Sequence, residues 1–455
     1  MIIAFLSLIV YLTWFQIFEA ETVKNNNYNK RQWINEEIIM RGSITDRNGL
    51  ELARSVRDEG SQITRRIYDY NNLYSHIIGY SYREYGKTGM EQKYNKVLLD
   101  IEESSTINEI KKMLDEDKVG NSIRTTLDHE LQKKARELID GKKGAMVVMN
   151  PKTGEIYAMV SYPDFEVSNL KDNWQSITEN PDSPLLNRAT QGVYEPGSTF
   201  KIITATALMN NKDISQDYYC KGTTLVDGYT FKDYSRRGHG NTDLNKAIIK
   251  SCNNYFIDKT LEIGKNRFGK TAEKFLINQE IPLETNVAKS QFDFRREMGK
   301  TELAASGIGQ GKVLMTPLNM ALATSAIVNK GSLVKPTLIK EVVNKDGDII
   351  DRHRPKEISR VLSEENALLL TEYMGNVVRQ GTGGRARIKD INVGGKTGTA
   401  ENASGNSHAW FVGFAPVEDP SLVVSIIVEE AGQGGRVAAP IAKEIIEYGI
   451  KERGL

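Results

Sequence analysis

Three short motifs carry residues that could perform acyl transfer. They occur along the chain in the order Ser198-Thr-Phe-Lys201, Ser251-Cys-Asn253 and Lys396-Thr-Gly-Thr399. A serine hydroxyl is a poor nucleophile at neutral pH and needs a base beside it. A lysine three residues further along a helix lies on the same face, and burial in apolar surroundings favours its neutral, basic form. The first motif therefore predicts a serine nucleophile with a lysine base.

The second motif supplies groups that can move a proton and hold a substrate. The hydroxyl of Ser251 can relay a proton between Lys201 and a leaving group. The amide of Asn253 can hold either a substrate carbonyl or the Lys201 ammonium. Both side chains are predicted to lie on one side of a tight loop.

The third motif is predicted to bind substrate along an edge strand. Lys396 and Thr397 would bind a carboxylate, and the small Gly398 would let a substrate backbone approach the strand. The backbone N–H of Thr399, paired with that of Ser198, would form an oxyanion hole. Together the three motifs predict an acyl-enzyme mechanism.

Each pattern also occurs elsewhere, so the sequence context must select the functional copies. Ser-x-x-Lys recurs at Ser168 and Ser332, Ser-x-Asn at Ser404, and Lys-Thr-Gly at Lys87 and Lys152. These copies lie in polar loops, before a proline or in a turn between predicted strands. The Ser198 copy instead follows a Pro-Gly pair and opens an apolar helix, which favours it as the nucleophile.

Hydrophobic patterning predicts the elements that would position these motifs. They are a helix from Asp128 through Arg136, two strands over 144–160, a helix over 243–250, an edge strand over 393–400, a strand over 422–428 and a closing helix over 438–450. These elements predict a large α/β (α+β) domain over residues 125–455. Residues 19–124 are polar and turn-rich, with strand-like pieces and a helical stretch over 103–114, and predict a smaller accessory domain.

Composition excludes several classes of protein. The chain has 455 residues, of which 39% are hydrophobic and 26% charged, as in a globular protein with more than one domain. Sixty basic and fifty-nine acidic residues leave a formal net charge of +1. No global positive field would draw this chain to nucleic acid, so we predict no nucleic-acid partner.

The first eighteen residues, 1–18, contain no charged side chain. As a helix they would be about 27 Å long, close to the roughly 30 Å hydrocarbon core of a bilayer, which predicts a membrane anchor. A cleaved signal peptide and a buried core helix are the alternatives. The nearest cations, Lys24, Lys30 and Arg31, follow the segment instead of preceding it, so charge gives no support for an external catalytic domain.

The motif set resembles that of class B penicillin-binding proteins, the membrane-anchored D,D-transpeptidases that cross-link peptidoglycan. Residues 41–49, 76–80 and 86–91 resemble the family's N-terminal pedestal, and residues 125–132, 309–317, 380–383 and 410–413 resemble its transpeptidase domain. The resemblance implies the transpeptidase and serine β-lactamase fold, an elongated pedestal and a single-pass anchor with the catalytic domain outside the cell.

The resemblance also implies a reaction and partners. Ser198 would attack the D-Ala-D-Ala bond of a stem peptide, release D-alanine and pass the acyl group to an amine of a neighbouring strand. β-Lactams would acylate the same serine. No class A glycosyltransferase region fits before Thr125, so a SEDS-family glycosyltransferase would polymerise the glycan. The alternatives are a D,D-carboxypeptidase or β-lactamase, and a non-catalytic scaffold or β-lactam sensor. Roles in septation, elongation and sporulation are all compatible with the motifs.

A second group of residues has the composition of a zinc site. Cys220, Asp233, His239 and Cys252 are separated by thirteen, six and thirteen residues, which leaves room for a loop to fold around one ion. Some elongation-type family members resemble this chain here, with a structural zinc and an aspartate where this chain has Cys220. The alternatives are a disulfide between Cys220 and Cys252, or two unpaired thiols. The chemistry itself needs no cofactor.

Overall fold

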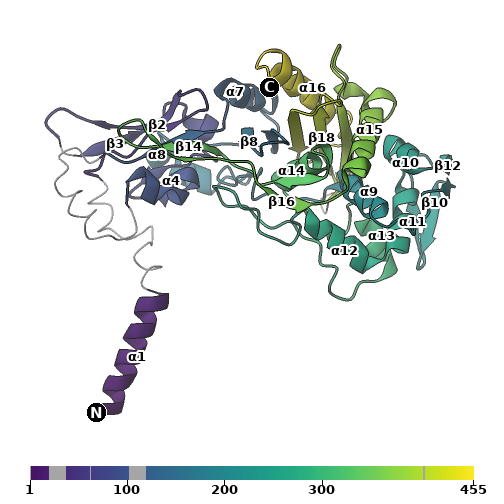
Figure 1. Ribbon diagram of the computed structural model, residues 1–455, viewed down its shortest axis with the longest axis horizontal. Coiled ribbons are helices and arrows are strands. Elements are labelled where there is room, and N and C mark those ends of the chain that lie inside the picture. The colour runs from purple at the N-terminus through teal and green to yellow at the C-terminus, as the bar shows by residue number, and fades with distance from the viewer. Residues whose placement is uncertain (1, 20–36, 62, 102–118, 403–404) are drawn as a thin grey trace.

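The structure is a computed structural model that describes residues 2–19, 37–61, 63–101, 119–402 and 405–455 (Figure 1). The N-terminal helix α1 (Ile2–Phe18) forms where the uncharged run predicts a helix. Among the described residues, no helix meets the length and apolarity needed to cross a bilayer. The helical stretch predicted over 103–114 lies outside the described residues.

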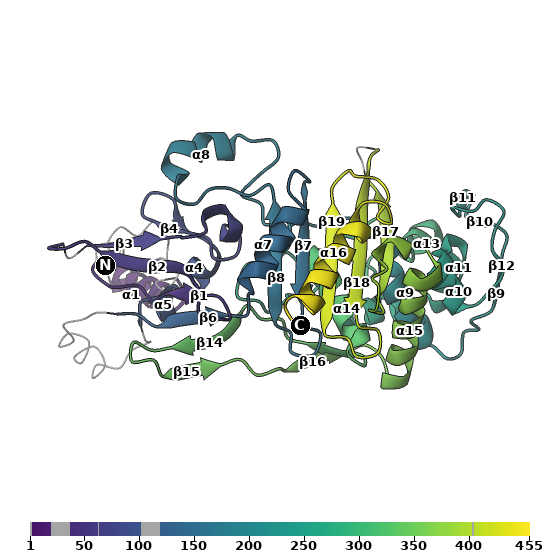
Figure 2. The ribbon, with the colours of Figure 1, turned by 90° about the horizontal axis from the view of Figure 1, so that it is seen from above.

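The first half of the molecule is built on a six-stranded sheet with the order β15-β14-β6-β1-β2-β3 (Figure 2). The strands are β1 (Ile44–Thr45), β2 (Glu51–Arg57), β3 (Thr64–Ile67), β6 (Ser122–Thr125), β14 (Ile339–Val343) and β15 (Ile349–Arg352). Strands β14 and β15 come from the middle of the region predicted as the catalytic domain. They pair antiparallel to each other and β14 pairs with β6, so the long hairpin ties the two halves together.

Short elements complete the pedestal around a buried carboxylate. They are η1 (Asn71–Tyr74), β4 (Ser81–Tyr82), β5 (Gly86–Lys87), α4 (Gly89–Lys93) and α5 (Asn95–Leu98). Glu91 is fully buried and pairs with Arg41 at 2.5 Å and with Arg66 at 2.7 Å. Burial alone would raise the pKa of Glu91, but the two guanidinium groups hold it below its usual value. The Lys87 copy of Lys-Thr-Gly is a buried strand residue here and not part of a polar loop.

The second half contains a five-stranded antiparallel sheet with the order β17-β18-β19-β7-β8 (Figure 2). The strands are β7 (Gly144–Met149), β8 (Ile156–Tyr162), β17 (Gly394–Glu401), β18 (Ser407–Ala415) and β19 (Leu422–Val428). Helix α14 (Pro317–Val328) covers one face, and α7 (His129–Leu138) and α16 (Ala438–Lys451) cover the other. This is the predicted mixed α/β class, with β17 at the edge of the sheet as expected.

The remaining helices and hairpins lie beyond β17 or between the two sheets, except for α8, which packs against the N-terminal half (Figure 2). They are α8 (Leu170–Thr178), η2 (Gly197–Phe200), α9 (Lys201–Met209), β9 (Tyr218–Cys220), β10 (Thr223–Val226), β11 (Tyr229–Lys232), β12 (Gly240–Thr242), α10 (Leu244–Lys250), α11 (Asn253–Ile263), α12 (Lys265–Lys274), α13 (Lys300–Ser306), β13 (Ser332–Val334), β16 (Glu357–Arg360), α15 (Glu364–Gln380) and η3 (Gly384–Ala386).

Two helices begin at acidic capping residues. The carboxylate of Asp128 accepts a hydrogen bond from the Leu131 N–H at 3.0 Å and begins α7. Asp243 accepts from the Lys246 N–H at 2.8 Å and begins α10 in the same way. Because each carboxylate satisfies an otherwise unpaired N–H of the first turn, these two starts were readable from the sequence.

Candidate active site

Ser198 lies in a tight helical turn. The sequence predicts it at the start of an α-helix, and the structure instead places it in the 3₁₀ turn η2, which runs directly into α9. The turn begins at Gly197 with a φ of 52°, a left-handed conformation that favours glycine. A Cβ at Gly197 would lie 2.7 Å from the Thr399 carbonyl oxygen, so the turn touches β17 directly.

Several contacts hold the serine turn against the sheet. The Gly197 N–H donates to the Gly309 carbonyl at 2.9 Å. Gly309 has a φ of 70°, and a Cβ there would lie 2.2 Å from the Gly197 carbonyl oxygen. The indole N–H of buried Trp410 donates to the Glu195 carbonyl at 3.0 Å. The position of Ser198 is therefore fixed by three separate segments of the chain.

A buried ion pair supports the loop that precedes Ser198. No sequence motif had indicated a role for its residues. The Tyr194 hydroxyl donates to Glu429 Oε1 at 2.7 Å, and Arg188 Nε donates to the same oxygen at 2.8 Å. Burial, and then the charge of Glu429, raise the pKa of Tyr194. The contact spans more than two hundred residues of sequence, so no local pattern could have identified it.

The Lys201 ammonium is enclosed by the second motif. Its Nζ donates to the Ser251 carbonyl at 2.7 Å, to Asn253 Oδ1 at 2.7 Å and to Ser251 Oγ at 3.2 Å. Ser251 ends α10 with a left-handed φ of 55°, which turns its carbonyl and hydroxyl toward the same amine. Lys201 is completely buried, and this burial lowers its pKa from 10.5 to about 8.

Lys396 approaches the same hydroxyl from β17. Its Nζ donates to Ser251 Oγ at 2.8 Å and to the Thr397 carbonyl at 3.0 Å. Burial, and then the nearby charge of Lys201, hold the pKa of Lys396 well below its usual value. Because Ser251 Oγ accepts from both lysines, its own proton remains available to a group in the cleft.

A cleft of about 770 Å³ opens in front of these residues and is lined by Ser198, Ser251, Asn253, Thr397 and Thr399, among others. Ser198 is partly exposed there, and its hydroxyl makes no hydrogen bond within the described part of the chain. Lys201 and Lys396 lie behind the lining and reach the cleft through Ser251. The structure thus gathers all three motifs, but it does not bring Ser198 Oγ into hydrogen-bond contact with Lys201.

Strand β17 presents its threonines to the cleft. Thr397 and Thr399 are two residues apart and share one side of the strand. The Thr382 and Thr397 hydroxyls are joined by a 2.7 Å hydrogen bond. Thr382 belongs to the segment 380–383, which resembles part of the family's transpeptidase domain but for which no role was predicted. A Cβ at Gly398 would lie 2.9 Å from the Thr199 methyl group, so the strand packs closely on the serine turn.

The other copies of the motifs have different surroundings. Ser168 is exposed and precedes α8, and Ser332 opens β13. Lys152 lies in the turn between β7 and β8 and pairs with Asp419 at 2.6 Å. Ser404 lies outside the described residues. None of the described copies lies on the cleft.

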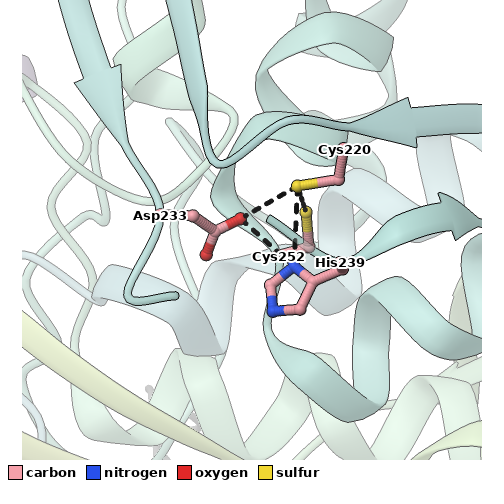
Figure 3. A group of neighbouring side chains, drawn as sticks. All are labelled: Cys220, Asp233, His239 and Cys252. Carbon is pink, nitrogen blue, oxygen red and sulfur yellow. Dashed lines mark hydrogen bonds and ion pairs between the residues drawn. The ribbon is translucent and has the colours of Figure 1, made fainter. Parts of the chain in front are cut away.

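The predicted metal ligands converge beside the second motif (Figure 3). One donor atom from each of Cys220, Asp233, His239 and Cys252 lies within 4.8 Å of all the others. Cys220 Sγ is 3.6 Å from Asp233 Oδ2, 3.6 Å from His239 Nδ1 and 3.3 Å from Cys252 Sγ, and both cysteines are free thiols. Tetrahedral ligation at about 2.0–2.3 Å requires donor separations of roughly 3.3–3.8 Å. Four separations, at 3.3–3.6 Å, match that range, but the set as a whole spans up to 4.8 Å, so a bound zinc ion would have to draw the most distant donors closer.

Comparison with known proteins gives two family matches. Residues 144–447 match the penicillin-binding protein transpeptidase domain, and residues 41–123 match the penicillin-binding protein A dimerisation domain. The peptidoglycan D,D-transpeptidase PbpA of Mycolicibacterium smegmatis is 31% identical over 99% of this chain and 98% of its own length. Stage V sporulation protein D of Bacillus subtilis is 32% identical over 86% of this chain and 64% of its own length.

Solved structures agree with these matches. The D,D-transpeptidase domain of a peptidoglycan glycosyltransferase from Eggerthella lenta is similar with a TM-score of 0.82 and 32% identity, covering 92% of this chain and 99% of that one. Penicillin-binding protein A of M. tuberculosis, as its ceftriaxone acyl-enzyme, is similar with a TM-score of 0.84 and 27% identity, covering 92% of this chain and 100% of that one.

Proposed function

Because this chain belongs to the class B penicillin-binding proteins, we infer that it cross-links peptidoglycan as a D,D-transpeptidase that β-lactams acylate and inhibit. The observation that carries this inference is the cleft where Ser198 meets Ser251 and β17, backed by the buried Lys201 and Lys396. The M. tuberculosis relative forms acyl-enzymes with ceftriaxone and penicillin G, which supports the same chemistry here.

The arrangement supports a stepwise acyl transfer. Ser198 Oγ attacks the carbonyl carbon between the two terminal D-alanines while its proton passes to neutral Lys201. The N–H groups of Ser198 and Thr399 stabilise the negative charge on the carbonyl oxygen, since the start of a helical turn leaves N–H groups without intrahelical partners.

The second step expels the leaving group. Lys201 returns its proton through Ser251 to the nitrogen of the terminal D-alanine, the C–N bond breaks, and the acyl group stays on Ser198. Ser251 suits this relay because its oxygen accepts from both lysines and its proton is free. An amine of a second stem peptide then attacks the ester and restores the Ser198 hydroxyl. Thr397 and Thr399 would hold the terminal carboxylate, whereas the buried Lys396, which was also predicted to bind it, reaches the cleft only through Ser251.

Intact mass spectrometry tests this function directly. Full-length protein in detergent, incubated with benzylpenicillin, should gain one drug mass, and peptide mapping should place it on the Ser198 peptide. An adduct that persists for hours is expected of a transpeptidase, whereas rapid loss would identify a hydrolase. Absence of any adduct would move the chain to the class of non-catalytic scaffolds.

We propose that zinc occupies the Cys220, Asp233, His239 and Cys252 set. The convergence of four donors from β9, the β11–β12 connection and the start of α11 supports an ion over a simple pair of thiols. Such an ion would add no catalytic step. It would brace the loop that presents Ser251 and Asn253, which flank Cys252 on both sides.

We propose that α1 anchors the protein in the cell membrane, with the catalytic domain on the extracellular side. The helix has seventeen uncharged residues and exposes apolar side chains along its length. At about 26 Å it is shorter than the roughly 30 Å hydrocarbon core and falls short of a full span. A bilayer accommodates a short apolar helix by thinning locally. The extracellular placement follows from the location of the proposed peptidoglycan substrate. A SEDS-family glycosyltransferase is the proposed partner in polymerisation, since neither matched family model is a glycosyltransferase.

Phase partition tests the anchor. Full-length protein should enter the detergent phase of a cloud-point extraction, and a fragment that begins at Asn25 should remain in the aqueous phase. Burial of the apolar side chains of α1, fourteen of its seventeen residues, in the detergent gives the expected difference. Equal partition of the two proteins would show that α1 does not anchor the chain.

A further inference from the structure

The rim of the active-site cleft carries an excess of positive charge. Five of the residues that line it are cationic: Lys232, Lys250, Arg385, Arg387 and Arg436. All five side chains are exposed, and none forms an ion pair with a carboxylate in the described part of the chain. The whole chain has a net charge of only +1, so this excess is local to the cleft.

The cations come from several segments that line the cleft. Arg385 and Arg387 belong to the connection between α15 and β17. A Cβ at Gly435, next to Arg436, would lie 2.9 Å from the Thr382 carbonyl oxygen and 3.5 Å from the Thr397 methyl group. Arg436 therefore flanks the threonines of β17.

The two lysines lie beside the second motif. The Lys232 carbonyl accepts from Asn253 Nδ2 at 3.1 Å, which places Lys232 beside the second motif. Lys250 immediately precedes Ser251 at the end of α10. A Cβ at Gly381 would lie 2.6 Å from the Ile249 carbonyl oxygen, so Lys250 also lies near the segment that carries Arg385 and Arg387.

The anionic side chains of the lining do not balance these charges. Asp233 directs its Oδ2 toward Cys220 and His239, and its Oδ1 accepts from the Tyr234 N–H. Glu401, at the end of β17, is the other carboxylate on the lining. The proposed substrate brings one terminal carboxylate, for which Thr397 and Thr399 already provide a site. The surplus of exposed cations favours a ligand that carries further anions.

We propose that this cleft selects stem peptides that carry at least one free carboxylate in addition to the terminal one. This specificity rests on the proposed transpeptidase function. The extra carboxylate belongs to the acyl-donor strand if the arginines beside β17 bind it, and to the amine-bearing acceptor strand if Lys232 and Lys250 bind it. Exposed ionic contacts of this kind give modest preferences that salt weakens.

A pair of penicillins tests the donor side. Benzylpenicillin and α-carboxybenzylpenicillin differ by one carboxylate on the side chain, which stands where the donor peptide continues. The quantity to compare is the second-order rate constant for acylation by α-carboxybenzylpenicillin divided by that for benzylpenicillin. In the full-length protein we expect this ratio to fall about three- to tenfold when salt is raised from 20 mM to 500 mM. The ratio should fall similarly at low salt in R385Q and R436Q. K389Q, an exposed cation of the same connection outside the cleft, should leave the ratio unchanged.

A pair of acceptors tests the other side. A diamino acid and its carboxamide offer the same amine with and without a carboxylate. Acyl transfer to each acceptor is measured from the same thioester donor, whose only charge lies on its leaving group. The free acid should be favoured several-fold at low salt, and K232Q and K250Q should remove that preference.

The outcomes separate the specificity from the function. A response in only one arm assigns the carboxylate to that strand, and a response in both assigns it to both. If neither ratio changes with salt or with any of the four cleft variants, the proposed specificity is overturned even though benzylpenicillin still acylates the protein. Failure of acylation itself would instead overturn the transpeptidase function.

Discussion

Replacing Lys201 by methionine should lower the rate of acylation by benzylpenicillin about a thousandfold, since a positioned base contributes roughly 10²–10⁴-fold. Methionine preserves the length of the buried side chain and removes the amine. The Ser198 hydroxyl would then lack its proton acceptor, because Lys201 is the amine that the second motif encloses behind the serine. Stopped-flow or intact-mass kinetics would measure the rate constant.

Two controls separate a base from a structural lysine. Loss of the amine leaves the Ser251 carbonyl and Asn253 Oδ1 without a donor, which costs about 1–3 kcal/mol for each unsatisfied group, so the thermal midpoint must be measured beside the rate. Lys201→Arg retains the charge and the donors but cannot act as a base near neutral pH. If the arginine variant acylates at more than about a tenth of the wild-type rate, Lys201 serves as a fixed charge and not as the base.

The pH dependence gives the same assignment a separate test. A lysine with a pKa lowered to about 8 is protonated below that pH and neutral above it. Acylation requires the neutral form, so its rate should rise about tenfold for each pH unit below pH 8 and level off above it. Lys201→Met should remove this slope. A wild-type rate that is flat between pH 6 and 9 would contradict the assignment.

Much of the site was predictable because it depends on local sequence. The Pro-Gly pair before Ser198, the cap at Asp243 and the apolar run of β19 each specify an element within a few residues. The three motifs lie at the ends or edges of such elements. Once those elements form, β17 pairs antiparallel with β18 and lies at the edge of the sheet.

The rest depends on contacts between distant segments. The pairing of β14 with β6 joins residues more than two hundred positions apart, and no local pattern announces that partner. The same holds for Tyr194 with Glu429, which are 235 residues apart. The hydrogen bond between Thr382 and Thr397 spans only fifteen residues, but it joins two different elements and no local pattern indicates it. The 3₁₀ geometry at Ser198 also escaped prediction, because the approach of Gly309 and β17 decides how tightly that turn winds.

Removing the proposed zinc should destabilise the catalytic domain and disable its second motif. Protein purified without chelator should contain one zinc per chain, and Cys252→Ser and His239→Ala should each lose it. An ion present at a thousandfold excess over its dissociation constant stabilises the folded state by about 4 kcal/mol, so the thermal midpoint should fall by roughly 10 °C. His353→Ala changes a histidine outside the cluster and should retain the metal.

The rate of acylation tests whether the proposed zinc site affects the reaction. Cys252 lies between Ser251 and Asn253, and its sulfur also accepts from the Tyr255 N–H at 3.4 Å to begin α11. Loss of the ion would free β9 and the β11–β12 connection and displace both neighbours, and a shift of 1 Å in such groups can lower a rate about a hundredfold. A Cys220–Cys252 disulfide in metal-free protein would appear as a loss of two mass units and of reactive thiols. That result would show that a covalent bond, and not zinc, braces the loop. Metal-free protein with two free thiols and undiminished stability would show that the cluster needs neither.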